Sequence, residues 1–429
     1  MSDSPKSPAG MIHPVSEIEE FAAWVLGMVV AVAVFFQVHL SLSGGPINLN
    51  LADPFAILAL AAVSLHMLFA RQLPVWRVKQ FNLALAVISL LLLLGFIHGW
   101  LEIGITQWAL GGRLLGWLVL LGYLSAGYVI VANVGAHGRR RFAETLIATA
   151  VVVVMLQVIL RLLYNWGVNT GAQLTQNFEG YAGNRNAFAF QLLACMALLL
   201  GYFQIYARHN VGSQRLARPW IFSLLLGILL AGLVWTGSRT GMLVGAMVLV
   251  LTWLGRMADR KMLGWGMIFA ALLWSLVLLA EQKYGNMSPQ SNMSIQSNLS
   301  DEGSNLERWE TLTHGLEMWQ QSPVLGVGLG VFNAKSPMWA GHPQVIHSTP
   351  LWILAEFGLL GGAVFGWTFF LLARHAIQFG RTQPANRILL LLLAAFAIFS
   401  LVHEIFYQRI FWLVLGAVLT QPFAHRRHA

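Results

Sequence analysis

One histidine and three arginines have positions that suit the binding and transfer of a phosphorylated group: His347, Arg185, Arg239 and Arg308. Arg185 and Arg239 each stand at the beginning of an apolar segment, where the free backbone N–H groups of a helix carry a partial positive charge. A cation is mildly unfavourable there unless an anion binds, and a guanidinium binds phosphate through two parallel hydrogen bonds. Ser238 fits the N-cap of the segment that begins with Arg239. These residues predict a polyanion site, with a diphosphate as the leading ligand.

His347 precedes a third apolar segment, in which Thr349 fits the N-cap and Pro350 the first helical position. The helix dipole and nearby arginines should lower the pKa of this histidine and keep it neutral at working pH. A neutral imidazole can accept the proton of a hydroxyl group. His347 is therefore the candidate general base.

Each of these residues also has a structural interpretation. An arginine at a membrane boundary often extends to lipid headgroups, and a single histidine is more often structural than catalytic. A metal site has little support, because neither a His-x-x-x-His pattern nor paired carboxylates accompany His347. Outward carboxylates cluster on one loop instead: Asp301, Glu302, Glu307, Glu310 and Glu317. Cys195 is the only cysteine, which excludes disulfides and cysteine-based clusters within one chain.

The composition places these residues in a membrane protein. Of 429 residues, 57% are hydrophobic and only 10% are charged, and the mean hydropathy is +0.66. A soluble domain carries roughly 25% charged residues. Apolar runs of about 20 residues can each cross about 30 Å of hydrocarbon. Such runs lie near 21–42, 52–70, 81–100, 114–134, 145–165, 185–207, 220–236, 239–257, 263–281, 349–373, 388–403 and 409–421. We expect an all-α integral membrane protein with about 12 transmembrane helices.

The distribution of charge predicts the orientation. With the N-terminus in the cytoplasm, all but eight of the 26 lysines and arginines lie on the cytoplasmic side, as the positive-inside rule requires. Both termini are then cytoplasmic, and the first span remains a helix because no cleavage-type signal precedes it. The net charge of +9 lies in loops between spans, so it does not indicate nucleic acid. The eight cations predicted to face outward are Arg113, Arg161, Arg185, Arg239, Lys283, Arg308, Lys335 and Arg409.

One long loop divides the chain. Residues 282–348 are predicted to form it on the outer side, between transmembrane helices 1–9 in residues 1–281 and helices 10–12 in residues 349–429. Polar repeats from 286 to 304 cannot bury enough apolar surface to order themselves, so this stretch is expected to be a mobile flap.

Short amphipathic structure is expected in the rest of the loop. Ser304 and Glu307 form a capping-box pattern at the start of a helix that Ser322-Pro323 ends. Its apolar stripe is expected on the membrane surface or against the bundle. The stripe consists of Leu306, Trp309, Leu312, Leu316 and Trp319. The glycine-rich run 326–330 resembles a nucleotide-binding loop, but no strand precedes it, so a tight turn is the better interpretation.

At these positions the sequence resembles the O-antigen ligases, within the larger family of O-antigen polymerases and ligases. The resemblance rests on the order of several short motifs between about 185 and 360. They are Ser238-Arg239-Thr240-Gly241, Glu307-Arg308-Trp309, the run from Ser322-Pro323 to Gly330, His347-Ser348-Thr349-Pro350-Leu351-Trp352 and Glu356-Phe357-Gly358.

The resemblance implies a glycosyltransferase of the bacterial inner membrane. Such a ligase transfers glycan from undecaprenyl diphosphate to a sugar hydroxyl of lipid A–core on the periplasmic face, without ATP or metal. It implies His347 as general base and Arg239 and Arg308 as the diphosphate-binding residues, to which the helix-start argument adds Arg185. Direct attack on C1 would invert the anomeric centre.

Three alternatives remain. A polymerase of the same family would use a second carrier-linked glycan as acceptor, and a protein O-oligosaccharyltransferase would use a side-chain hydroxyl. The latter relatives often extend further past the last spans, so the end of this chain at Ala429 favours a ligase. A transporter of polyanions or lipid-linked glycans is disfavoured, because intramembrane charge is scarce.

Overall fold

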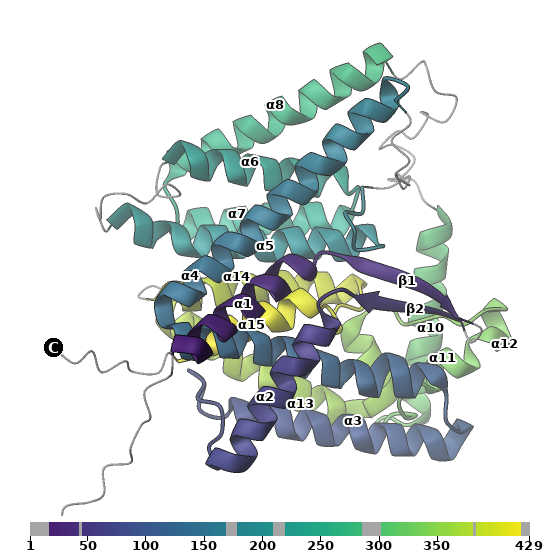
Figure 1. Ribbon diagram of the computed structural model, residues 1–429. Coiled ribbons are helices and arrows are strands. Elements are labelled where there is room, and N and C mark those ends of the chain that lie inside the picture. Colours follow the sequence, from purple (N-terminus) through teal and green to yellow (C-terminus); the bar gives the residue numbers. More distant parts are fainter. Residues whose placement is uncertain are drawn as a thin grey trace, which may run out of the picture.

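The computed structural model describes residues 17–42, 45–168, 178–208, 219–284, 302–380 and 383–421, which are mostly helical (Figure 1). Within them, eight helices are long and apolar enough to cross a membrane. Four of them are whole helices: α2 (Asp53–Ala70), α3 (Phe81–Ile103), α13 (Thr349–Phe379) and α14 (Pro384–Val402). Two are parts of longer helices: Arg185–Tyr202 in α5 (Arg185–Arg208) and Arg260–Ala280 in α8 (Arg260–Tyr284). The other two divide the π-helix η1 (Trp108–Leu115) and the long helix α4 (Gly116–Asn165) into the spans Trp108–Gly135 and His137–Tyr164. The chain is a mostly all-α, multi-pass membrane protein.

Three further apolar helices in the described part are shorter than a full span: α6 (Pro219–Trp235), α7 (Arg239–Leu254) and α15 (Arg409–Leu419). Each coincides with an expected transmembrane segment. Because these three helices are shorter than a full span, the total of about 12 transmembrane helices remains a prediction.

The first expected span, 21–42, is wrong in its second half. Helix α1 covers Glu17–Ala33, and the chain then forms β1 (Gln37–Leu42), antiparallel to β2 (Gly45–Asn50) with Gln37 opposite Asn50. The sequence from Gln37 to Leu42 alternates polar and apolar residues, which is the period of a strand. Gly45-Pro46, at the start of β2, would also interrupt a helix. In Figure 1 this hairpin extends toward the side of α10–α12.

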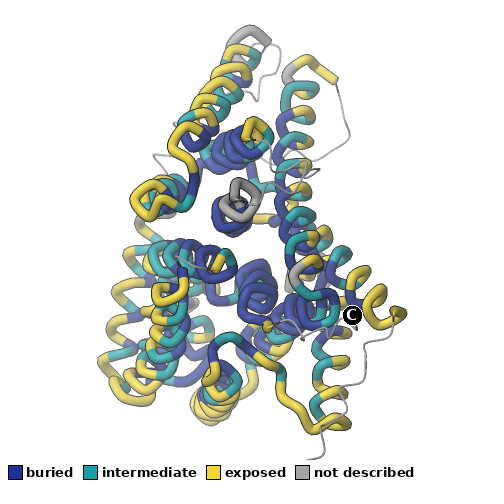
Figure 2. Tube along the Cα trace, turned by 90° about the vertical axis from the view of Figure 1, so that its left-hand side faces the viewer, coloured by how far each residue is buried: buried dark blue, intermediate teal, exposed yellow. Residues whose placement is uncertain are grey.

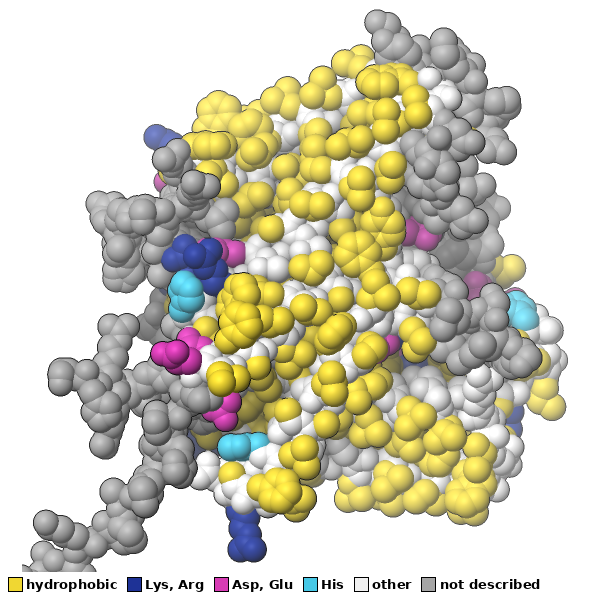
Figure 3. Space-filling view, viewed as in Figure 1, with side chains coloured by type: hydrophobic (Ala, Val, Ile, Leu, Met, Phe, Trp, Pro, Cys, Tyr) yellow, Lys and Arg dark blue, Asp and Glu magenta, His cyan; other side chains and the backbone are white. Residues whose placement is uncertain are grey.

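The buried residues lie where helices pack against one another inside the bundle. In Figure 2 buried residues concentrate on helix faces that meet inside the bundle, and exposed residues line its outside. Residues 410–419 of α15 are all buried, which makes this short helix a central element. Gly127 of α4 and Gly416 of α15 allow the two backbones to approach, because a Cβ at either position would meet the other helix's main chain. On the face in Figure 3, charged side chains gather mainly toward two opposite edges, with hydrophobic ones between them.

The segment after Gln321 inserts between α3 and α13. The backbone N–H of Gly328 donates to the carbonyl of Glu356 and that of Leu329 to the carbonyl of Gly95. Gly326, Gly328 and Gly330 all have positive φ, at 72°, 99° and 86°. The prediction of a tight turn is confirmed.

Three helices form the described part of the predicted long loop: α10 (Glu302–Gln321), α11 (Val331–Lys335) and α12 (Pro337–Ala340). Ser304 lies inside α10, so it is not the N-cap and the predicted capping box is wrong. Helix α10 already includes Glu302, two residues before Ser304. Residues 286–301 of the predicted flap lie outside the described residues.

Helix α10 has two different faces. Thr311 and Met318 are buried, and Gly315 lies against Leu351 at the start of α13. On the predicted apolar stripe, Leu306 and Trp309 are 61% and 67% exposed. The bundle therefore receives the other face of the helix, and contact of the stripe with a membrane surface remains a prediction.

Candidate active site

The starts of three helices, α5, α7 and α13, are linked at one end of the bundle. The hydroxyl of Ser238, before α7, donates to Oδ1 of Asn186 in the first turn of α5 at 2.8 Å. Nε2 of His403, after α14, lies 3.2 Å from Oγ1 of Thr240 in α7. The hydroxyl of Thr349, in α13, donates to the carbonyl of His403 at 3.1 Å. The segment after α14 thus connects α7 to α13.

The helix caps hold these starts in place. Ser238 is the N-cap of α7, as predicted. The predicted N-cap of α13, Thr349, is wrong: Ser348 is the cap and accepts from the backbone N–H of Leu351 at 3.4 Å. Thr349 is the first helical residue, and its buried hydroxyl accepts from the N–H of Ile405 at 3.0 Å. The Thr349 hydroxyl therefore joins α13 to the segment after α14 instead of capping its own helix. Consequently, Pro350 is at the second helical position rather than the first.

His347 lies beside the first turns of α10. Its Nε2 is 3.7 Å from Oε1 of Glu307, and 31% of its side chain remains exposed. Partial burial is the largest effect on its pKa, which lies below the ordinary value. The Arg308 charge also lowers this pKa, whereas Glu307 and, more weakly, Glu404 raise it. The direction is the one expected from the sequence, but burial rather than the helix dipole is the main cause. The imidazole of His347 is accordingly neutral at neutral pH.

Arg308 and Arg185 lie close enough to His403 for their charges to act on it, and Arg239 is next to a residue that contacts it. Burial, the largest cause, together with the charges of Arg308, His347 and Arg185, lowers the pKa of His403 to about 3. Arg308 and Arg185 are half-buried. Arg239 is exposed at the first position of α7, next to the Thr240 that contacts His403. All four candidates therefore belong to one end of the bundle.

Sequence reasoning missed two residues of this region. The sequence pattern favours a helix-capping role for Glu307, but its carboxylate is the acidic neighbour of His347. His403 shows no distinctive spacing, because its contacts come from α7 and α13, which are remote in sequence. His342, by contrast, is exposed, and its Nδ1 lies 2.9 Å from the carbonyl of Ala340 in its own loop.

A buried ion pair supports the segment that carries His403. Nη1 of Arg113 lies 3.0 Å from Oε2 of Glu404, and their side chains are 3% and 13% exposed. The guanidinium of Arg113 also lies 4.6 Å from the ring centroid of Trp108, 5.0 Å from that of Trp352 and 4.6 Å from that of Tyr407. Such contacts stabilise a desolvated cation.

Two more of the cations predicted to face outward have carboxylate partners. Arg409 binds both carboxylate oxygens of Asp53, at 2.8 and 3.0 Å, and Nζ of Lys335 lies 3.1 Å from Glu102. Arg409 begins α15, so ion pairs hold the 403–409 segment near both of its ends. These partners explain why such cations persist against the positive-inside bias.

Across the described residues, no group of three or more histidine, cysteine, aspartate or glutamate side chains is arranged to hold a metal ion. The fold and the site together define a multi-pass membrane protein. Near the starts of α5, α7 and α13 it carries a neutral histidine, His347, among arginines.

The comparison with known families agrees with the resemblance seen in the motifs. Residues 223–366 match the sequence model of the family described as O-antigen ligase (Wzy_C). The matched segment contains Arg239, Arg308 and His347, while Arg185 precedes it. The resemblance to the O-antigen ligase superfamily is thereby confirmed over this segment. A search of curated proteins finds no match.

Proposed function

We propose that the protein is an O-antigen ligase of the bacterial inner membrane. It takes glycan from undecaprenyl diphosphate and attaches it to a sugar hydroxyl of lipid A–core, with its site facing the periplasm. The observation that carries this proposal is the arrangement of His347, held neutral by partial burial, beside Arg308 and the starts of α5, α7 and α13. A base next to several cations suits attack by a hydroxyl on a diphosphate-linked sugar.

The reaction uses these residues in two roles. His347 accepts the proton of the acceptor hydroxyl as its oxygen bonds to C1 of the donor sugar. The bond from C1 to the diphosphate oxygen breaks at the same time, and its electrons leave with undecaprenyl diphosphate. Arg239, Arg308 and Arg185 bind the diphosphate and stabilise the charge that it gains. Attack opposite the leaving group inverts the anomeric carbon.

Glu307 acts as a positioning residue for the base. Its carboxylate lies 3.7 Å from Nε2 of His347, close enough to stabilise the imidazolium that forms when the proton arrives. An acidic neighbour of this kind also restricts the orientation of a catalytic histidine. Glu307 therefore favours the protonated form of His347, whereas Arg308 favours the neutral form.

The orientation of the chain is part of the proposal. About 12 spans, with both termini in the cytoplasm, place residues 282–348 in the periplasm. A cysteine at Ser297 should react with a membrane-impermeant thiol reagent from outside, and one at Gln383 should not. The native Cys195 is fully buried, which gives a low background. The reverse labelling pattern would contradict the proposed location of the site.

A transfer assay tests the proposed activity. Purified protein in detergent is given an undecaprenyl diphosphate-linked glycan and lipid A–core, without ATP or an ion gradient. We expect glycan-modified lipid A–core from the wild type and none from His347→Ala. Transfer only to a second carrier-linked glycan would identify a polymerase, and transfer to a protein hydroxyl would identify a protein O-oligosaccharyltransferase. If none of the three acceptors is modified, the enzymatic proposal is wrong and transport is the remaining alternative.

A further inference from the structure

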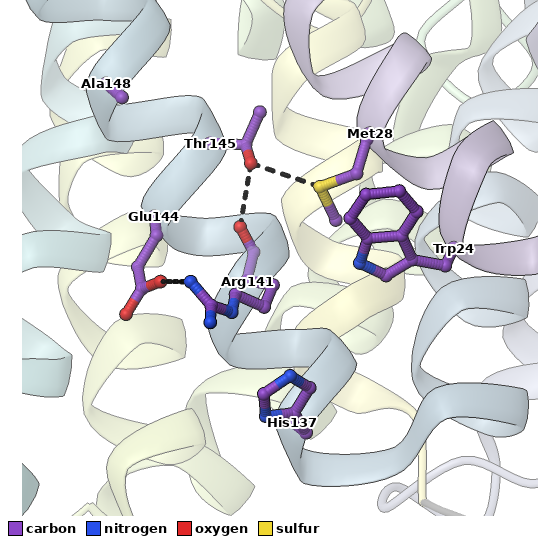
Figure 4. A pocket seen from close by; sticks show the side chains of 7 residues that line it. All are labelled: Trp24, Met28, His137, Arg141, Glu144, Thr145 and Ala148. Atoms are coloured by element: carbon purple, nitrogen blue, oxygen red, sulfur yellow. Dashed lines mark hydrogen bonds and ion pairs between the residues drawn. The ribbon is translucent and has the colours of Figure 1, made fainter. Parts of the chain in front are cut away.

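A second polar site lies far from His347 along the sequence, between α1 and α4. A pocket of about 530 Å³ opens there, next to the break in α4 at Gly135 (Figure 4). Side chains from both helices point toward it. It is lined by Trp24, Met28, His137, Arg141, Glu144, Thr145 and Ala148.

The polar side of this pocket belongs to a basic stretch of α4. Residues 137–144 contain three arginines and one glutamate. The carboxylate of Glu144 lies 2.7 Å from Nε of Arg140 and 3.4 Å from Nη1 of Arg141, so it contacts two guanidiniums. The Arg141 side chain is 53% exposed. Arg139, by comparison, is buried and donates to carbonyls at the end of α15. Of the three arginines, Arg141 lines the pocket together with Glu144, so a ligand there would meet the exposed guanidinium of Arg141 within a basic segment.

The position of the pocket corresponds to the surface of a membrane. The break at Gly135 separates the candidate spans Trp108–Gly135 and His137–Tyr164, so the pocket lies at the end of both. Trp24 is 39% exposed beside it, and tryptophan favours the level of lipid headgroups. Met28 and Ala148 lie further along their helices, on the apolar side of the pocket.

We propose that this pocket binds the headgroup of an anionic phospholipid. The phosphate is placed at Arg141 and His137, and the glycerol and upper acyl chains lie against Trp24, Met28 and Ala148. Trp24, Met28 and Ala148 make one side of the lining apolar, which suits an amphiphile better than a free anion. Basic pockets between transmembrane helices bind acidic lipid headgroups by this combination of charge and apolar contact.

Lipid binding to the full-length protein in detergent tests this proposal. Retention of added phosphatidylglycerol is measured by native mass spectrometry, with phosphatidylcholine as the neutral lipid. We expect preference for phosphatidylglycerol in the wild type and about fivefold weaker retention in Arg141→Gln. Arg374→Gln is the matched control, because Arg374 is also exposed near one end of a helix but does not line the pocket. Arg141→Lys should keep most of the preference.

Several results would overturn the proposal. Equal losses in Arg141→Gln and Arg374→Gln would indicate diffuse charge attraction instead of a site. Equal retention of the two lipids would exclude an anionic phospholipid as the ligand. Displacement of phosphatidylglycerol by glycerol phosphate at equal concentration would contradict the proposed contact of the acyl chains with the apolar lining. Thermal unfolding of each variant in detergent alone shows whether it is folded, and a wild type that fails to retain either lipid also contradicts the proposal. Glycan transfer is not needed for this readout, so failure of the proposed ligase activity is distinguishable from failure here.

Discussion

Arg113 and Arg308 are both cations that the predicted topology places outside, against the positive-inside bias, but the structure places them in different environments. Arg113 is 3% exposed, ion-paired to Glu404 and enclosed by three aromatic rings. Arg308 is half-buried on α10, beside a histidine that is 31% exposed. A desolvated charge with a carboxylate partner contributes to structure. A half-buried charge next to an accessible histidine can also contact a substrate, so removing the two should have different consequences.

The largest expected effect is on catalysis at His347. His347→Ala should lower the transfer rate by about 10² to 10⁴, because the acceptor hydroxyl loses its base. Donor binding should change little, since a neutral imidazole adds no charge to the diphosphate. Single-turnover transfer and binding of the lipid-linked donor measure the two effects separately. His342→Ala is the control, and loss of transfer in that variant alone would show that the base is assigned to the wrong histidine.

The buried pair should respond through stability. Arg113→Gln leaves Glu404 without its cation in the interior, which costs about 3 to 5 kcal/mol. Thermal unfolding in detergent should show a marked loss, and the double variant Arg113→Gln/Glu404→Gln should recover part of it. Arg308→Gln should leave unfolding nearly unchanged. Equal destabilisation by the changes at Arg113 and Arg308 would remove the contrast between the two regions.

Arg308→Lys tests whether geometry matters in addition to charge. An ammonium cannot form the two parallel hydrogen bonds of a guanidinium to phosphate, so transfer should fall by at least about tenfold while the protein stays folded. The measurement is the transfer rate at saturating acceptor as donor concentration is varied. Normal transfer by Arg308→Ala would instead support contact with lipid headgroups, and the same criterion applies to Arg239→Ala.

The smallest effect concerns pH. Transfer should decline as pH falls through the pKa of His347, because only the neutral imidazole acts as a base. Glu307 raises that pKa. Glu307→Gln should therefore move the acidic limb of the rate profile to lower pH and reduce the plateau modestly. Glu310→Gln is a control on the same helix. A limb that stays in place, or moves to higher pH, would show that Glu307 does not act on His347.

The sequence alone predicted most helices, because transmembrane segments are long, apolar and bounded by charge. It failed from Gln37 to Leu42, where a short alternating pattern follows an apolar helix without a strong stop signal. The candidate residues were found because helix starts and cations are visible in one dimension. That all of them lie at one end of the bundle depends on contacts such as Ser238 to Asn186 and His403 to Thr240.

Only the tertiary structure determines which side chains interact with one another. Residues 113 and 404 are almost 300 positions apart, so no local pattern could show that Arg113 and Glu404 form an ion pair. Glu307 fits a helix cap by spacing, and Thr349 fits one by residue type, yet each side chain serves a neighbouring element instead. A side chain's use depends on the nearest competing donor or acceptor. In a bundle of helices that neighbour usually comes from another part of the chain.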